Sequence, residues 1–153
     1  MPQAKYYWDA GLFIALLTNE QRRDPSDMPG LFEIVDLADA EEAIIVTSAN
    51  TFGEVLDRPG HQPIRDQLRS LFQRPNFVLV EPNVTIIEKA ADYREEFRLR
   101  LPDATHLATA VLYRVDEMHT FDEDDLIPLS GRASLNNLRI RKPSAPQKRL
   151  DLG

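Results

Sequence analysis

Two kinds of apolar pattern alternate along this chain, and this alternation limits the folds that it can adopt. The segment AIIVTS, residues 43–48, is a continuous run rich in β-branched residues, which is typical of a strand buried on both faces. The segment LFEIVDLADAEEA, residues 31–43, instead places apolar side chains on one side of a helix and acids on the other. Chains that alternate in this way form parallel sheets whose strands are joined by right-handed helical crossovers.

The same two patterns recur from end to end. They predict strands at 5–8, 43–48, 76–82, 118–121 and 138–141, and helices at 10–21, 31–43, 49–57, 64–72, 84–99 and 103–113. The segment RRDPSDMPG, residues 22–30, is rich in Pro, Asp and Gly and is predicted to be a loop. The sequence therefore predicts a three-layer α/β/α sandwich with a mainly parallel sheet of four to five strands. We expect one domain over residues 1–142 and a frayed C-terminal tail over 143–153.

Composition excludes several classes of function. The 153 residues suit one domain with its own core, and the absence of cysteine removes disulfide frameworks, thiolate nucleophiles and zinc–thiolate sites. It also favours a cytoplasmic location, and the apolar run at 12–17 is too short to cross a membrane. A net charge of −7 disfavours general attraction to nucleic acid, but residues 132–153 are basic. This basic tail is compatible with phosphate contact, partner contact or simple solvation.

Acidic residues fall where the predicted strands end. Asp9 ends the first strand, Glu54 lies in the helix that follows Ser48 at the end of the second, Asp103 opens the last predicted helix, and Asp122 ends the fourth strand. Because ligands bind beyond the carboxyl ends of parallel strands, we expect these four acids to converge. Each also has a purely structural interpretation. Asp9 and Asp103 can cap helices, Asp122 can be a turn residue, and Glu54 can lie on a solvated helix face.

One shared cause explains four acids better than four separate ones. Crowded carboxylates repel each other, and burial makes their ionisation costlier, whereas a divalent cation relieves both costs. Oxygen ligands favour Mg²⁺ or Mn²⁺, and three histidines make a zinc centre a poor alternative. His106, three residues after Asp103, can face either this site or the core. A cluster that binds Mg²⁺ is suited to phosphodiester cleavage, and the chain has no G-x-S-x-G elbow, phosphate-binding glycine loop or dinucleotide fingerprint.

Four segments taken together resemble a known family. They are YYWDAGLFIALL, VTSANTFGEVLD, LPDATHLATAVLY and HTFDEDDL, in this order. The set resembles the PIN-domain ribonucleases, which include the toxins of bacterial and archaeal toxin–antitoxin pairs. The resemblance implies RNA cleavage by a metal-activated water, with Asp9, Glu54, Asp103 and Asp122 as metal ligands and catalytic acids. It also implies a homodimer and an antitoxin protein that fills the active-site groove.

The resemblance implies supporting roles for two further residues, and the chain departs from the family pattern in two places. Thr120 and Ser48 would position side chains or solvent. Ala10 stands where the family often has Ser or Thr, and the chain beyond Asn137 is longer than the domain needs. We expect the adjacent acids at 124 and 125 to be solvated turn residues. The main alternative is a PIN-fold module that binds RNA or protein without cleavage. A receiver-like signalling domain is disfavoured, because it requires an acidic pair after its first strand and a well-placed lysine.

Overall fold

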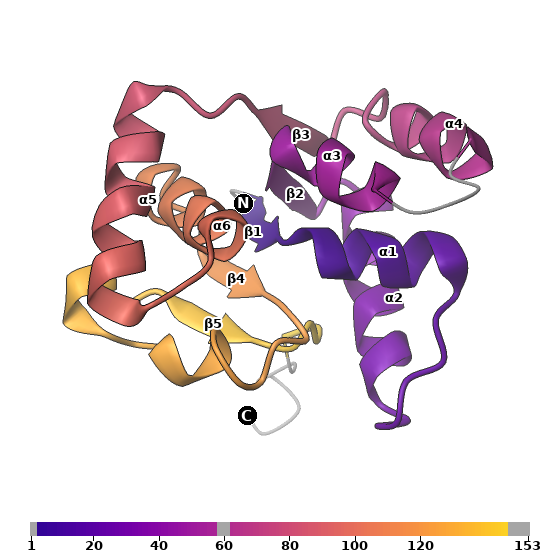
Figure 1. Cartoon of the computed structure of the whole chain (residues 1–153). Helices are drawn as coiled ribbons and strands as arrows, with labels where there is room; N and C mark the ends of the chain where they lie inside the picture. The colour runs from indigo at the N-terminus through magenta and orange to yellow at the C-terminus, as the bar shows by residue number, and fades with distance from the viewer. Residues whose placement is uncertain (1–2, 58–61, 147–153) are drawn as a thin grey trace, which may run out of the picture.

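The computed structural model describes residues 3–57 and 62–146. Its strands form one five-stranded, entirely parallel sheet (Figure 1). The strands are β1 (Ala4–Trp8), β2 (Ala43–Ser48), β3 (Phe77–Val80), β4 (Glu117–His119) and β5 (Arg139–Arg141), and their spatial order is β3-β2-β1-β4-β5. The chain first moves outward from β1 to β3 and then returns to the other side of β1. The order therefore reverses at β1, and this is the place where α/β sheets leave a crevice beyond the strand ends.

Helices cover both faces of the sheet, which confirms the predicted three-layer α/β sandwich. They are α1 (Ala10–Thr18), α2 (Asp27–Asp39), α3 (Asn50–Leu56), α4 (Gln62–Leu71), α5 (Val84–Phe97) and α6 (Leu101–Leu112), with short 3₁₀ turns at Ile127–Leu129 and Ala133–Leu135. In β1, Tyr7 points into the core shared with α5 and α6, whereas Tyr6 and Trp8 point into the core shared with α1 and α2. This is the side-chain alternation expected of a strand between two layers.

Several element boundaries differ from the sequence prediction by a few residues, and three of these differences change the place of Pro29, Asp122 or Asp103. The predicted loop at 22–30 ends early, because α2 begins at Asp27 and takes Pro29 into its first turn, where a missing N–H costs little. Strand β4 ends at His119, so Asp122 lies in the turn beyond it and does not end the strand itself. Helix α6 begins at Leu101, which makes Asp103 its third residue and not its cap.

The chain after β5 packs against the start of α2. A Cβ at Gly30 would collide with the backbone carbonyl of Pro143, so this contact requires glycine. Beside it, Lys142 Nζ lies 3.0 Å from the buried carboxylate of Asp27 and 3.1 Å from Glu123. The predicted domain boundary at 142 stays a prediction, and residues 147–153 of the predicted tail lie outside the described residues. Among the residues described, no helix is both long and apolar enough to cross a membrane.

Candidate metal centre

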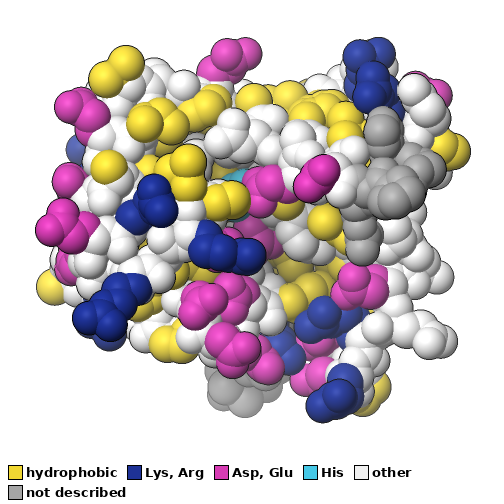
Figure 2. Space-filling model, viewed as in Figure 1, with side chains coloured by type: hydrophobic (Ala, Val, Ile, Leu, Met, Phe, Trp, Pro, Cys, Tyr) yellow, Lys and Arg dark blue, Asp and Glu magenta, His cyan; other side chains and the backbone are white. Residues whose placement is uncertain are grey.

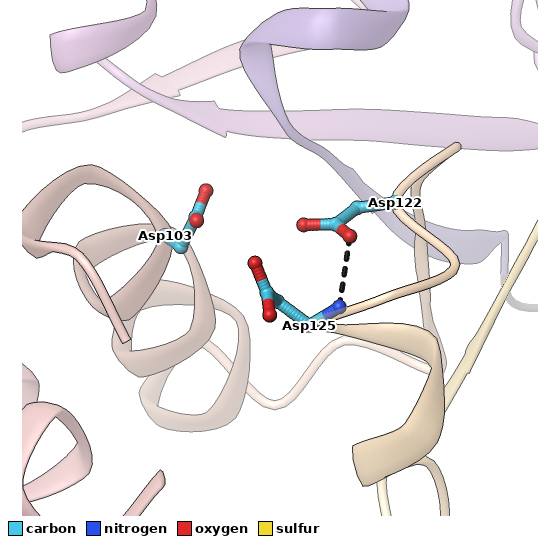
Figure 3. Close-up of side chains that lie close together, drawn as sticks. All are labelled: Asp103, Asp122 and Asp125. Carbon is cyan, nitrogen blue, oxygen red and sulfur yellow. Dashed lines mark hydrogen bonds between the residues drawn. The ribbon is translucent and has the colours of Figure 1, made fainter. Parts of the chain in front are cut away.

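Three aspartates meet beyond the carboxyl end of β4 (Figure 3). Asp103 comes from the first turn of α6, and Asp122 and Asp125 come from the turn that follows β4; one carboxylate oxygen from each lies within 4.8 Å of the others. The turn folds around Asp122, because its Oδ1 accepts the backbone N–H groups of Asp124 at 3.1 Å and Asp125 at 2.9 Å. The two hydrogen bonds bring Asp125 back to the site, although it is exposed.

The surroundings of Asp103 disfavour the ionised form of its carboxyl. Burial raises the pKa of its carboxyl, and the negative charges of Asp122 and Glu54 raise it further, whereas Arg100 opposes this rise. Arg100 Nε lies 3.8 Å from Asp103, but the arginine side chain is 84% exposed, so solvent screens the attraction. A cation among these carboxylates would relieve both the burial and the repulsion.

Asp9 follows β1 and joins the same region through Thr120. Its Oδ1 accepts the N–H of Leu12 at 3.3 Å, so Asp9 does cap α1, as one interpretation of the sequence expected. Its Oδ2 accepts the Thr120 hydroxyl at 2.6 Å, and the Thr120 oxygen in turn accepts the N–H of Asp122 at 3.0 Å. Burial raises the pKa of the Asp9 carboxyl, and the charge of Asp103 adds to this effect. Capping and a place in the acidic site are therefore compatible.

Glu54 reaches the site from α3 and is held by His106. Its Oε2 lies 2.7 Å from His106 Nε2, while His106 Nδ1 lies 2.6 Å from the hydroxyl oxygen of Tyr7. The His106 ring is 1% exposed, so it packs in the core and contacts a site residue at the same time. Gly53, the residue before Glu54, is not required by packing, because a Cβ there would meet no described atom within 4 Å.

The structure brings the sequence-predicted acids together unequally. Asp103 and Asp122 belong to the tightest group. Asp9 is connected to this group through Thr120, and Glu54 through its electrostatic interaction with Asp103. Asp125 was assigned to a solvated turn, and it is exposed in a turn, but its carboxylate is also the third member of the group. The only sequence signal for it is a position three residues after Asp122. The hydroxyl of Ser48 accepts the N–H of Asn50 and so supports the start of α3.

The donor set fits a hard divalent cation. The nearest potential ligands are all carboxylate oxygens, which Mg²⁺ and Mn²⁺ prefer. Figure 2 shows acidic side chains gathered in the middle of this face of the molecule, with Lys and Arg side chains around them. This combination can hold a metal ion at the centre while cationic side chains at its rim attract a phosphate-bearing ligand.

Comparisons with known proteins identify the family to which this fold belongs. The PIN domain family model matches residues 6–127. No match was found among curated proteins. Among solved structures, a toxin–antitoxin complex from Klebsiella pneumoniae is similar at 26% identity and a TM-score of 0.57, over 78% of this chain and 88% of that one.

Two further solved structures share the fold at lower identity. Mycobacterium tuberculosis VapC20, a toxin that cleaves the sarcin–ricin loop, has a TM-score of 0.60 at 16% identity, over 78% of this chain and 91% of that one. VapBC2 from Rickettsia felis, bound to a DNA fragment of its promoter, has a TM-score of 0.61 at 11% identity, over 89% and 96% of the two chains. The family match covers most of the chain, from β1 to the acidic turn after β4, and the chain therefore belongs to the PIN domain family.

Proposed function

We propose that this protein is an endoribonuclease that depends on Mg²⁺ or Mn²⁺ and acts as the toxin of a toxin–antitoxin pair. The observation that carries the proposal is the convergence of Asp103, Asp122 and Asp125 within 4.8 Å, beside Asp9 at the end of β1. Membership of the PIN family supports nuclease chemistry. The similar complex from Klebsiella pneumoniae and the RNA-cleaving toxin VapC20 support the narrower assignment.

The side chains divide the work between binding and orientation. When bound, a divalent ion would neutralise the carboxylates, acidify a water and stabilise charge on the phosphate. Asp103, Asp122 and Asp125 would hold the ion, and Asp9 and Glu54 would complete its surroundings. Thr120 donates to Asp9 and accepts from the backbone of Asp122, so it keeps both acids in register. Arg100 is largely exposed beside Asp103 and is placed to contact an RNA phosphate.

A cleavage assay with end-labelled structured RNA tests the proposal directly. We expect cleavage with Mg²⁺ or Mn²⁺ and none after addition of EDTA. Asp103→Asn and Asp122→Asn should each lower the rate by about 100-fold or more, because each removes a charge that contacts the metal. Asp92→Asn, which removes an exposed carboxylate on α5, is the control and should cleave like the wild type. Cleavage that persists in EDTA, or in both site variants, contradicts the proposal.

The alternative is a PIN-fold module that binds without cleaving. Such a module gains nothing from partly buried acids whose pKa values are raised, as those of Asp9 and Asp103 are, because they destabilise the fold when no cation is bound. RNA that binds to the wild type and stays intact with both metals would favour this alternative.

Partners form a separate part of the proposal. We propose an antitoxin partner because the similar structure from Klebsiella pneumoniae is a toxin–antitoxin complex. The homodimer and the cytoplasmic location are proposed on family habit alone. Light scattering on the purified chain would test the dimer. Co-expression with the adjacent reading frame would test the antitoxin, since a true antitoxin should co-purify and suppress RNA cleavage.

A further inference from the structure

We infer that His106 is a positioning residue, which holds the Glu54 carboxylate toward the acidic site, and that Tyr7 determines which His106 nitrogen carries the proton. The structural part stands on contacts between these three side chains. Its consequence for metal binding rests on the proposed function. The chain of contacts runs from the sheet, through the core, to the site.

Tyr7 makes the first two contacts of this chain. Its side chain is fully buried on β1, and its oxygen accepts the backbone N–H of Ser48 at 3.0 Å. The same oxygen lies 2.6 Å from His106 Nδ1. A phenol has a single proton, which it can donate to Nδ1 at this distance, and because an ionised Glu54 carboxylate can only accept, a neutral ring must donate from Nε2. Nδ1 then acts as an acceptor, and the neutral ring carries its proton on Nε2.

The Nε2 proton meets Glu54. Nε2 lies 2.7 Å from Glu54 Oε2, so the buried ring donates to a carboxylate whose side chain is 30% exposed. Within the described part of the chain, His106 is the one hydrogen-bond or ion-pair partner of Glu54. A glutamate on a short surface helix otherwise has several rotamers. The ring, which packing holds in place, therefore selects one rotamer of Glu54, and no other described residue forms a hydrogen bond with its second carboxylate oxygen.

Outer hydrogen bonds of this kind matter for metal binding. Partners that orient a ligating carboxylate or histidine affect metal affinity or activity by about 10–100-fold when they are lost. Glu54 is close enough to Asp103 for its charge to raise the pKa of the Asp103 carboxyl. Holding Glu54 in place thus keeps a negative charge beside the ion that Asp103 would bind.

The chain supplies its own matched control. His119 is also fully buried; it accepts the indole N–H of Trp8 on Nδ1 at 3.2 Å, and its Nε2 lies 3.1 Å from Glu117 Oε1. Glu117 is outside the acidic cluster and is paired with Arg141 at 3.1 Å. Substitutions at His119 therefore remove a comparable buried contact without touching the site.

The experiment measures Mn²⁺ affinity by calorimetry on the whole chain, for the wild type and for His106→Leu, His106→Gln and His119→Leu, at a temperature where all are folded. We expect His106→Leu to weaken Mn²⁺ binding by about 10–100-fold. His106→Gln, whose amide can donate near the Nε2 position, should recover most of that loss. His119→Leu should bind Mn²⁺ like the wild type. A purely structural role for His106 predicts instead that both leucine variants weaken binding alike.

A second measurement does not depend on the metal. Nitrogen-15 NMR of the histidine rings in metal-free protein should show His106 with its proton on Nε2, and Tyr7→Phe should shift the ring toward a mixture of tautomers and weaken Mn²⁺ binding. These readings remain available if a His106 variant fails to fold. An Nδ1–H ring, an unchanged ring in Tyr7→Phe, equal affinities for the leucine and glutamine variants, or a wild type that does not bind Mn²⁺ overturns the inference.

The proposed function fails separately. If Mn²⁺ binding and the histidine spectra behave as expected but no RNA is cleaved, the positioning role stands and the nuclease proposal falls. If RNA is cleaved but His106→Leu binds Mn²⁺ as tightly as the wild type, only the positioning role falls.

Discussion

His106–Glu54 and His119–Glu117 are two versions of one contact in one molecule. In each, Nδ1 of a buried ring lies within hydrogen-bond distance of an aromatic residue of β1, and Nε2 meets a glutamate. The two lie on opposite faces of the sheet, because Tyr7 and Trp8 point into different cores. The difference lies in what surrounds the glutamate.

The negative charge of Glu117 is balanced by the neighbouring Arg141. Burial disfavours its ionisation, but the hydrogen bond from His119 and the charge of Arg141 outweigh burial and lower the pKa of its carboxyl. Glu54 has no lysine or arginine partner among the described residues and faces the other acids. The comparison teaches that a histidine–glutamate contact becomes structural when a cation completes it within the protein. Without that cation, the glutamate charge remains available for an ion from solution.

The largest expected effect separates the two glutamates by activity. Glu54→Gln should lower metal-dependent RNA cleavage by about 100-fold, because it removes a charge from the site. Glu117→Gln should change it by less than about threefold, or about 0.6 kcal/mol of activation free energy. Single-turnover cleavage of labelled RNA measures both. Equal losses in the two variants would break the comparison.

For the free energy of unfolding, we expect the reverse order: the loss of Glu117 should cost more than the loss of Glu54. Glu117→Ala leaves a buried histidine and Arg141 without their partner, so it should lower the free energy of unfolding by about 3 kcal/mol. Glu54→Ala leaves one buried donor, His106 Nε2, without its partner but leaves no cation unpaired, so it should cost less, about 1 kcal/mol. Urea unfolding of metal-free protein gives both values. A larger cost at Glu54 would show that it is the structural member.

The pH dependence of stability should reveal the protonation of the His119 ring. Burial lowers the pKa of its ring, while Glu117 opposes this shift. Below pH about 6.5 the unfolded chain therefore takes up a proton that the folded ring resists, and stability falls as the pH decreases. We expect a loss of about 1–2 kcal/mol between pH 7 and pH 5 in metal-free protein. In His119→Gln the fall should be shallower, and parallel curves would remove His119 as the cause.

The smallest expected effect concerns Asp103. Its pKa is raised, so the ionised form is disfavoured in the folded state and the penalty applies at pH values above that pKa. Asp103→Asn removes this penalty but also loses an acid from the first turn of α6, which favours negative charge. Without metal, Tm should stay equal or rise by about 2–4 °C. A fall of several degrees would show that Asp103 mainly supports the helix.

The sequence predicted those features that depend on local pattern. The strand at 43–48 was predicted to the residue, because a continuous β-branched run is typical of a strand that is buried on both faces. The start of α2 was missed, since Pro29 suggests a loop but is acceptable in a first helical turn. The confirmed order of strands and helices follows from alternation, which is a local signal.

Contacts between distant segments were less predictable. The interaction of Tyr7 with His106 joins residues 99 apart and depends on how α6 packs over β1, which no periodicity encodes. Asp125 was discounted because a turn acid is usually solvated, and only the hydrogen bonds to Asp122 turn it inward. The roles of Asp9, Glu54, Asp103 and Asp122 in catalysis remain a proposal, although the structure places them around one site.

The contact between Gly30 and Pro143 has a consequence for biosynthesis. Lys142, beside that contact, pairs with Asp27 in α2 and with Glu123 in the turn that carries Asp122 and Asp125. Lys142 follows every acid of the site in the chain, and its ion pairs join this turn to α2. These ion pairs can therefore form only after synthesis has passed Lys142, when all the carboxylates of the site are already part of the nascent chain.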